Sequence, residues 1–216
     1  MKKKLALFII LAVFLTQMPF IGPYFSIVNT LIHEAGHAIM SLVTGGDVQS
    51  IALFSNTEGA TLVSNRYWLG GFMTSIAGYV FASYMAYLFL TLIYKRKSRY
   101  VLLIFLGLLL ISLIFWIRNL YGLFWIITII AVFSWVLARG SKRILDYFAL
   151  FIASLVLVES VTSAFEIMFL SFVSPSNAGD ATTLANMTFL IPALVWGIAF
   201  FVQALFFARL GLRRYF

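Results

Sequence analysis

The chain has 216 residues, of which 63% are apolar, 18% aromatic and only 10% charged, with a net charge of +8. Soluble domains usually contain about 25% charged residues, and a soluble core of this size could not hide so much apolar surface. The composition therefore excludes a soluble enzyme and a disordered tail, and the absence of cysteine excludes a disulfide-stapled secreted domain. The basic residues form short clusters between apolar runs, which is typical of a polytopic membrane protein and not of a nucleic-acid-binding protein.

A helix needs about 20 apolar residues to cross the hydrocarbon layer of a membrane. Seven stretches approach that length, and Pro19 and Pro23 end the first of them. We expect an all-α polytopic membrane protein with six to seven transmembrane helices, forming one integral membrane domain over residues 1–216. The stretches are 5–21, 24–44, 68–94, 100–117, 120–138, 147–173 and 184–208.

One segment between the second and third stretches does not have the pattern of a helix. Gly45 and Gly46 end the preceding helix. Two segments have the pattern of strands, residues 48–54 and 60–63, and residues 55–59 between them have the pattern of a turn. The sequence therefore predicts a short β-hairpin directly after the second stretch.

Small residues recur at helical spacing in the third stretch, at Gly71, Ser75, Gly78 and Ala82. This stripe predicts close helix packing and not a functional site.

The basic clusters leave two membrane topologies open. The clusters at 95–99, 139–143 and 209–214 fall on one side, the cytoplasmic side, if the last four stretches each cross once. Lys2, Lys3 and Lys4 should also be cytoplasmic, but three full crossings would then place Lys95 on the opposite side. Either an early stretch fails to cross, or the N-terminus is outside.

One motif in the second stretch contains residues that can bind a metal and transfer a proton. Residues His33-Glu34-Ala35-Gly36-His37 fit the pattern H-E-x-x-H, and on a helix two histidines four residues apart project from the same face. Two such imidazoles can bind one Zn²⁺, which activates water, and Glu34 can accept the proton as general base and pass it to the leaving amine.

A chance match to so short a motif is the alternative interpretation. Both histidines of the chain lie in the motif, within an apolar stretch where ionisable residues are costly and usually functional. The polar residues of this stretch also share an arc of roughly 140° at about 100° per residue. They are Ser26, Asn29, Thr30, His33, Glu34, His37, Ser41 and Thr44. We therefore interpret the motif as a metal site.

A catalytic zinc has three protein ligands, and the third must be an acid because no other histidine or cysteine exists. Asp47 and Glu58 are expected in solvent near the hairpin. Asp146 follows Arg143 and is expected at the interface or at the start of a helix.

Three further acids remain. Glu159 and Glu166 lie seven residues apart within an apolar stretch, where they could be ligands or part of an interhelical hydrogen-bond stripe with Thr162 and Ser163. Asp180, within residues 177–182, opens the last helix, where it could be a ligand or an N-cap.

These residues resemble the site-2 protease family of intramembrane zinc metallopeptidases, particularly its compact bacterial members. The strongest similarity is His33-Glu34-Ala35-Gly36-His37-Ala38, followed by Leu42-Val43-Thr44-Gly45-Gly46 and a hairpin containing Gly59. Weaker similarities are Arg118-Asn119-Leu120-Tyr121-Gly122, Gly179-Asp180-Ala181, Leu184-Ala185, Pro192 and Trp196.

The resemblance implies an intramembrane zinc metalloendopeptidase in a bacterial plasma membrane, with His33 and His37 holding the zinc and Glu34 as the base. Its partners would be the lipid bilayer and a membrane protein or peptide as substrate, with no nucleic acid. The resemblance also implies that the hairpin pairs with an unwound substrate strand, because helical peptide bonds are shielded by their own hydrogen bonds.

The chain departs from the family pattern at one position. Better-known members have a Leu-Asp-Gly motif whose Asp is the third ligand, but here Leu145-Asp146 is followed by Tyr147. We therefore expect Asp180 as the third ligand, with Glu166 as its rival.

The alternative function is a metal-binding membrane protein without proteolysis, either a carrier or a scaffold derived from a protease. Glu159 and Glu166 could then line an ion path. A carrier usually shows repeated halves, and we find no internal repeat in this sequence.

Overall fold

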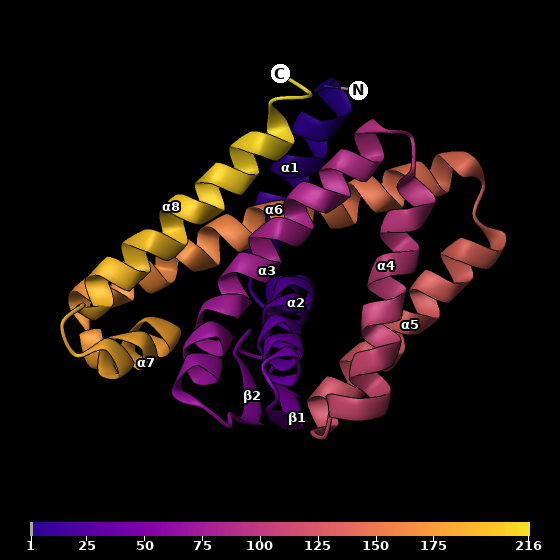
Figure 1. Ribbon diagram of the computed structural model, residues 1–216. Coiled ribbons are helices and arrows are strands. Elements are labelled where there is room, and N and C mark those ends of the chain that lie inside the picture. Colours follow the sequence, from indigo (N-terminus) through magenta and orange to yellow (C-terminus); the bar gives the residue numbers. More distant parts are fainter. Residues whose placement is uncertain (1) are drawn as a thin grey trace.

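The computed structural model describes residues 2–216 and is mostly helical, as expected (Figure 1). Eight α-helices and one two-stranded hairpin follow one another along the chain. They are α1 (Lys2–Thr16), α2 (Gly22–Val43), β1 (Asp47–Leu53), β2 (Gly59–Ser64), α3 (Trp68–Tyr94), α4 (Ser98–Ile111), α5 (Leu120–Arg139), α6 (Lys142–Val173), α7 (Gly179–Thr188) and α8 (Ala193–Leu212). A π-helical turn, Ser112–Trp116, extends α4, and a 3₁₀ turn, Pro175–Asn177, precedes α7.

Within residues 2–216, five helical segments are long and apolar enough to cross a membrane, so the expected six to seven are not confirmed. They are α3, α4 with its π-helical turn, α5, α6 and α8. Helix α1 has 15 residues and is about 22 Å long, which is too short for a layer of about 30 Å. Helix α2 has 22 residues but carries the polar face of the motif.

The last predicted stretch, 184–208, is not one helix. Helix α7 ends at Thr188, Phe189 follows with a φ of 56°, and Pro192 precedes α8. A left-handed residue and a proline both interrupt a helix, but an apolar count does not register either when their neighbours are apolar. The break leaves Asp180 on a short separate helix.

The structure places the N-terminal lysines at the same end of the molecule as the later basic clusters. Helices α1 and α2 together carry the chain from the end that holds both termini to the hairpin, and α3 returns it (Figure 1). Lys4, Arg96 and Arg143 line one cavity at that end, and Arg214 donates a hydrogen bond to Thr91 near the end of α3. The N-terminal lysines and the later basic clusters can therefore lie on the same side of the membrane, because α1 does not cross by itself.

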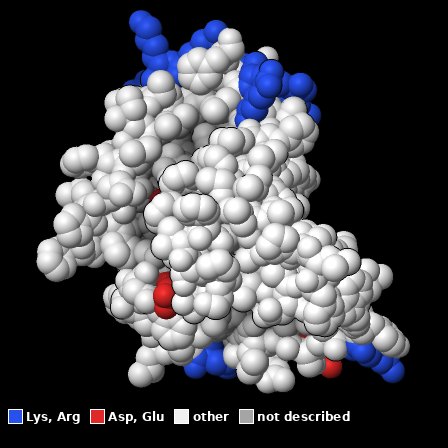
Figure 2. Space-filling model, turned by 90° about the vertical axis from the view of Figure 1, so that its left-hand side faces the viewer, with Lys and Arg blue, Asp and Glu red and all other residues white. Residues whose placement is uncertain are grey.

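The remaining two basic residues lie at the opposite end. Arg66 follows β2, and the backbone N–H of Arg118 donates to Ile51 of β1. In Figure 2 a broad band with few charged side chains separates the basic residues of the two ends. Large apolar side chains such as Phe14, Trp135 and Phe206 are exposed, as expected where a protein faces lipid.

Helix α2 packs closely against α3 because glycine occupies the contact. A Cβ atom on Gly36 would lie 2.8 Å from the Cβ of Phe81 and 2.9 Å from the carbonyl oxygen of Ala77. Small residues let two helix backbones approach in a membrane, where packing replaces the hydrophobic effect as the driving force. The close approach brings the polar face of α2 beside α3.

The expected hairpin is present, and β1 pairs with β2 in antiparallel register from Asp47↔Ser64 to Leu53↔Gly59. The outer edge of β1 is covered. Ile51 forms a parallel bridge with Ile117, and the Asn119 side chain both accepts from the Leu53 N–H and donates to the Leu53 carbonyl. Within residues 2–216, β2 has no second neighbouring strand, so its outer edge stays available.

Candidate metal centre

A cavity of about 640 Å³ lies between α2, α3, α6, α7 and the hairpin. Five of the chain's seven acidic residues line it, and no lysine or arginine does. These acids are Glu34, Glu58, Glu159, Glu166 and Asp180. A cavity with this charge favours the binding of cations.

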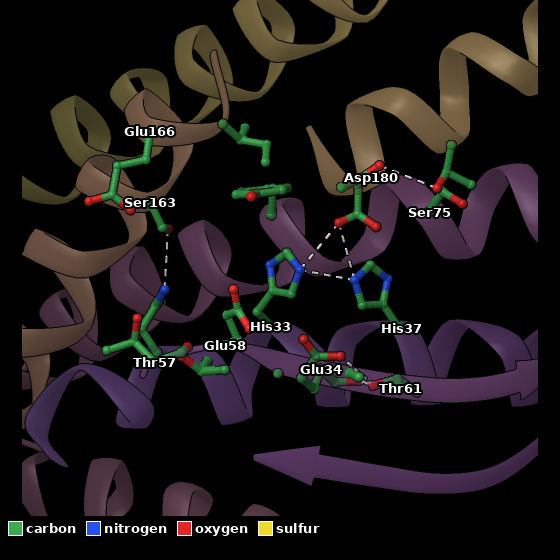
Figure 3. Close-up of a pocket in the computed structure, with 18 of the residues that line it drawn as sticks. His33, Glu34, His37, Thr57, Glu58, Thr61, Ser75, Ser163, Glu166 and Asp180 are labelled. Carbon is green, nitrogen blue, oxygen red and sulfur yellow. Dashed lines mark hydrogen bonds and ion pairs between the residues drawn. The ribbon is translucent and has the colours of Figure 1, made fainter. Parts of the chain in front are cut away.

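Two histidines and one aspartate converge in this cavity (Figure 3). The Nε2 atoms of His33 and His37 are 2.9 Å apart, and they lie 3.2 Å and 3.3 Å from Oδ2 of Asp180. One ligand atom from each residue lies within 4.8 Å of the others, so the group could hold a metal ion. Imidazole nitrogen and carboxylate oxygen are ligands that Zn²⁺ accepts.

Neighbouring groups orient both imidazoles. Nδ1 of His37 lies 2.7 Å from the backbone carbonyl oxygen of Thr74 on α3. A carbonyl oxygen can only accept, so Nδ1 carries a hydrogen and Nε2 is the nitrogen that can bind a metal. The ring of Tyr79 contacts the ring of His33 edge to face, with centroids 4.5 Å apart.

The hairpin holds the acid of the motif. Glu34 is 6% exposed, and its Oε2 accepts a hydrogen bond of 2.6 Å from the Thr61 hydroxyl of β2. Gly59 permits this approach, because a Cβ atom there would lie 2.6 Å from Oε1 of Glu34. The carboxylate is therefore fixed beside the two imidazoles with one oxygen engaged by the hairpin.

Gly78 of α3 lies directly against the imidazoles. A Cβ atom there would lie 2.5 Å from Nε2 of His37 and 2.6 Å from Nε2 of His33. The small-residue stripe, which the sequence predicted to serve only helix packing, therefore also leaves room for the histidines.

Asp180 lies in the first turn of α7, where the helix dipole favours a carboxylate. Its side chain does not cap α7, whose N-cap residue is Ala178, so an N-cap role is excluded. Burial alone would raise the pKa of Asp180, but the charge and hydrogen bonds of His37 and His33 outweigh burial and hold that pKa well below its usual range. The carboxyl is therefore ionised, as metal binding requires.

The other acids do not join this group. Glu166 lines the cavity on the other side from Asp180 (Figure 3), and Glu159 lies two turns earlier on α6. Part of the expected polar stripe is present, since the side chain of Asn29 donates to the Ser163 hydroxyl at 3.4 Å.

The three acids expected in solvent or at the interface are where the sequence placed them. Asp47 is exposed at the start of β1, and Asp146 lines a different cavity near the start of α6. Glu58 is exposed in the hairpin, but it also lines the cavity of the histidines.

Four residues of the site were not assigned to it from the sequence: Thr61, Thr74, Gly78 and Tyr79. Each belongs to the hairpin or to α3, and each reaches α2 only through tertiary packing. The one available signal was the spacing of small residues around Gly78.

A family model described as Peptidase M50B-like matches residues 5–211, which is nearly the whole chain. No curated protein and no solved structure shows significant similarity to the chain.

Proposed function

Since the chain belongs to the Peptidase M50B-like family, we propose that it is a zinc metalloendopeptidase acting within a bacterial plasma membrane. Its substrates would be membrane-spanning or membrane-adjacent segments of proteins. The observation that carries this proposal is the convergence of His33, His37 and Asp180 beside the buried carboxylate of Glu34.

In this proposal His33, His37 and Asp180 hold the metal. When bound, zinc supplies Lewis acidity, which activates water and polarises a peptide carbonyl. The Thr74 carbonyl keeps His37 in the tautomer whose Nε2 faces the site. The anionic cavity, which has no lysine or arginine in its lining, supports selection of a divalent cation.

Glu34 is the proposed general base. The Thr61 hydroxyl engages Oε2, so the carboxylate takes a proton from the attacking water at Oε1 and later delivers it to the leaving amine nitrogen. The fixed position of the carboxylate keeps the proton transfer short and limits the reorganisation that the reaction needs.

The open edge of β2 is the proposed docking strand for the substrate. Gly59, Ala60, Thr61 and Val63 of this strand line the cavity, whereas the outer edge of β1 is already covered by residues 117–119. A substrate segment must leave its helix before a peptide bond can be attacked. Pairing with β2 would satisfy the backbone groups that unwinding frees.

Glu34→Gln tests this proposal. The variant and the wild type are expressed in membranes and crosslinked, and the single-span proteins that co-purify with the variant are identified. Each of these proteins is then placed in vesicles with the wild type or with the variant, and its cleavage is measured. We expect the wild type to cleave such a protein, and the variant to retain stoichiometric zinc without cleaving it. Unimpaired cleavage by the variant would refute the role of Glu34.

Cation transport is the competing function, because Glu159 and Glu166 line the same cavity as the histidines. It would be supported by cation flux through vesicles that is lost in Glu159→Gln and Glu166→Gln, with no peptide cleavage. The absence of zinc from wild-type protein purified without chelators would contradict both functions.

A further inference from the structure

A second cavity, of about 480 Å³, lies at the end of the molecule that holds both termini. It joins three segments that are far apart in sequence: the start of α1, the turn between α3 and α4, and the start of α6. Its lining residues are Lys4, Ile93, Arg96, Ser98, Lys142, Arg143, Asp146, Tyr147 and Leu150.

The charge of this cavity is not balanced by the protein. It has four cationic side chains and one carboxylate, that of Asp146. Across residues 2–216 the ion pairs within 4 Å involve only the two histidines and Asp180, so none of these four cations is paired. Lys4 donates instead to the hydroxyl of Tyr147 at 2.7 Å.

Arg96 occupies a backbone position that usually belongs to glycine. Its φ is 61°, and it lies in the turn that ends α3, where its N–H donates to Ile93 and the N–H of Lys97 donates to Leu92. Glycine adopts this left-handed conformation without strain, whereas arginine does not. Arg96, which lines the cavity, therefore holds this backbone position at a conformational cost.

Ser98 adds a donor that has no partner. It is 5% exposed and lines the cavity, and its hydroxyl forms no hydrogen bond with any residue in 2–216. The hydroxyl is therefore free to donate to a ligand in the cavity.

Two helix N-termini add to the positive potential. Helices α4 and α6 begin at Ser98 and Lys142, and neither has an acidic residue in its first turn. The positive end of each helix dipole therefore meets Arg99 in α4 and Lys142 and Arg143 in α6, an arrangement that repels other cations and attracts an anion.

We propose that this cavity binds a phosphate group. A guanidinium group can donate two parallel hydrogen bonds to two oxygens of one phosphate, and lysine and serine supply further donors. The end that carries the basic clusters is the cytoplasmic end by the positive-inside rule, so the cavity lies at the leaflet where anionic lipids concentrate. Ile93 and Leu150 give it an apolar wall, which favours a phospholipid headgroup over free phosphate.

The experiment compares two paired variants of the full chain in detergent. Arg96→Gln with Arg143→Gln removes two charges from the cavity, and Arg209→Gln with Arg213→Gln removes two charges from exposed positions on the same side, outside its lining. Binding of phosphatidylglycerol, phosphatidylcholine and inorganic phosphate is measured by native mass spectrometry and by the shift in unfolding temperature. The unfolding transition of each variant without ligand reports whether it is folded.

We expect phosphatidylglycerol to bind the wild type and to raise its unfolding temperature, with at least about 10-fold weaker binding in the cavity variant and near wild-type binding in the control. Phosphatidylcholine should bind weakly. Competition by millimolar inorganic phosphate would assign the site to free phosphate. Equal losses in both variants would show general attraction to a basic surface and would overturn the proposal, as would the absence of any binding. The test does not depend on proteolysis.

Discussion

The hydroxyl of Thr61 donates to Oε2 of Glu34 across 2.6 Å and ties the hairpin to the carboxylate of the motif. The same hydroxyl lies 3.1 Å from the backbone carbonyl oxygen of Glu34, so strand β2 is anchored to α2 at this point. A strand proposed to receive substrate and a carboxylate proposed to move a proton are thus positioned by a single side chain.

Thr61→Val should lower kcat/KM for a cleaved substrate by about 10- to 100-fold, because a hydrogen bond to a charged group contributes about 1.5–3 kcal/mol. The substitution keeps the side-chain shape and removes only the hydroxyl, so bound zinc should stay stoichiometric. Thr61→Ser keeps the hydroxyl and is the matched control, expected within a few-fold of wild type. Wild-type activity in Thr61→Val would show that the contact does not position Glu34.

Gly78→Ala should disrupt the metal centre, because the new methyl group would lie 2.5–2.6 Å from both imidazoles. We expect zinc affinity, measured by competition with a chromophoric chelator, to fall by at least about 10-fold, comparable to the loss of an orienting contact. Gly107→Ala on α4 is the control, because nothing lies within 4 Å of its Cβ position. Unchanged zinc affinity in Gly78→Ala would mean that the histidines can move aside without loss of the site.

Asp180→Asn and Glu166→Gln decide between the two candidate third ligands. The carboxylate of Asp180 lies within 3.3 Å of both imidazole nitrogens, so its neutralisation should weaken zinc binding by more than about 100-fold. Glu166→Gln should retain zinc, because Glu166 is not part of the converging group. The opposite pattern in the same chelator titration would assign the role to Glu166.

Much of the fold could be predicted because its signals are local. The stretch predicted at 68–94 coincides with α3, and the hairpin follows its glycine pair as expected. His33 and His37 share a helix face because of their spacing alone, and the structure places them together on α2.

The third ligand of the candidate site could not be predicted, because it depends on contacts between distant parts of the chain. Asp180 approaches His33 and His37 from a helix more than a hundred residues away, and apolar patterning does not specify which acid does so. The sequence analysis did not predict the short length of α1 or the break at Phe189, for a different reason. Hydropathy measures how apolar a stretch is and does not register where its helix ends.

The orientation of the molecule in the membrane gives a final prediction. All lysines and arginines except Arg66 and Arg118 belong to the clusters on the side of both termini, so the hairpin should face away from the cytoplasm. The chain has no cysteine, so single cysteines can be introduced without a background. In intact cells a membrane-impermeant maleimide should label Ser55→Cys in the hairpin turn, and Lys97→Cys only after permeabilisation. Both positions are exposed, which makes each the control for the other. Labelling of Lys97→Cys alone in intact cells would invert the orientation, and would move the proposed phosphate cavity to the outer leaflet.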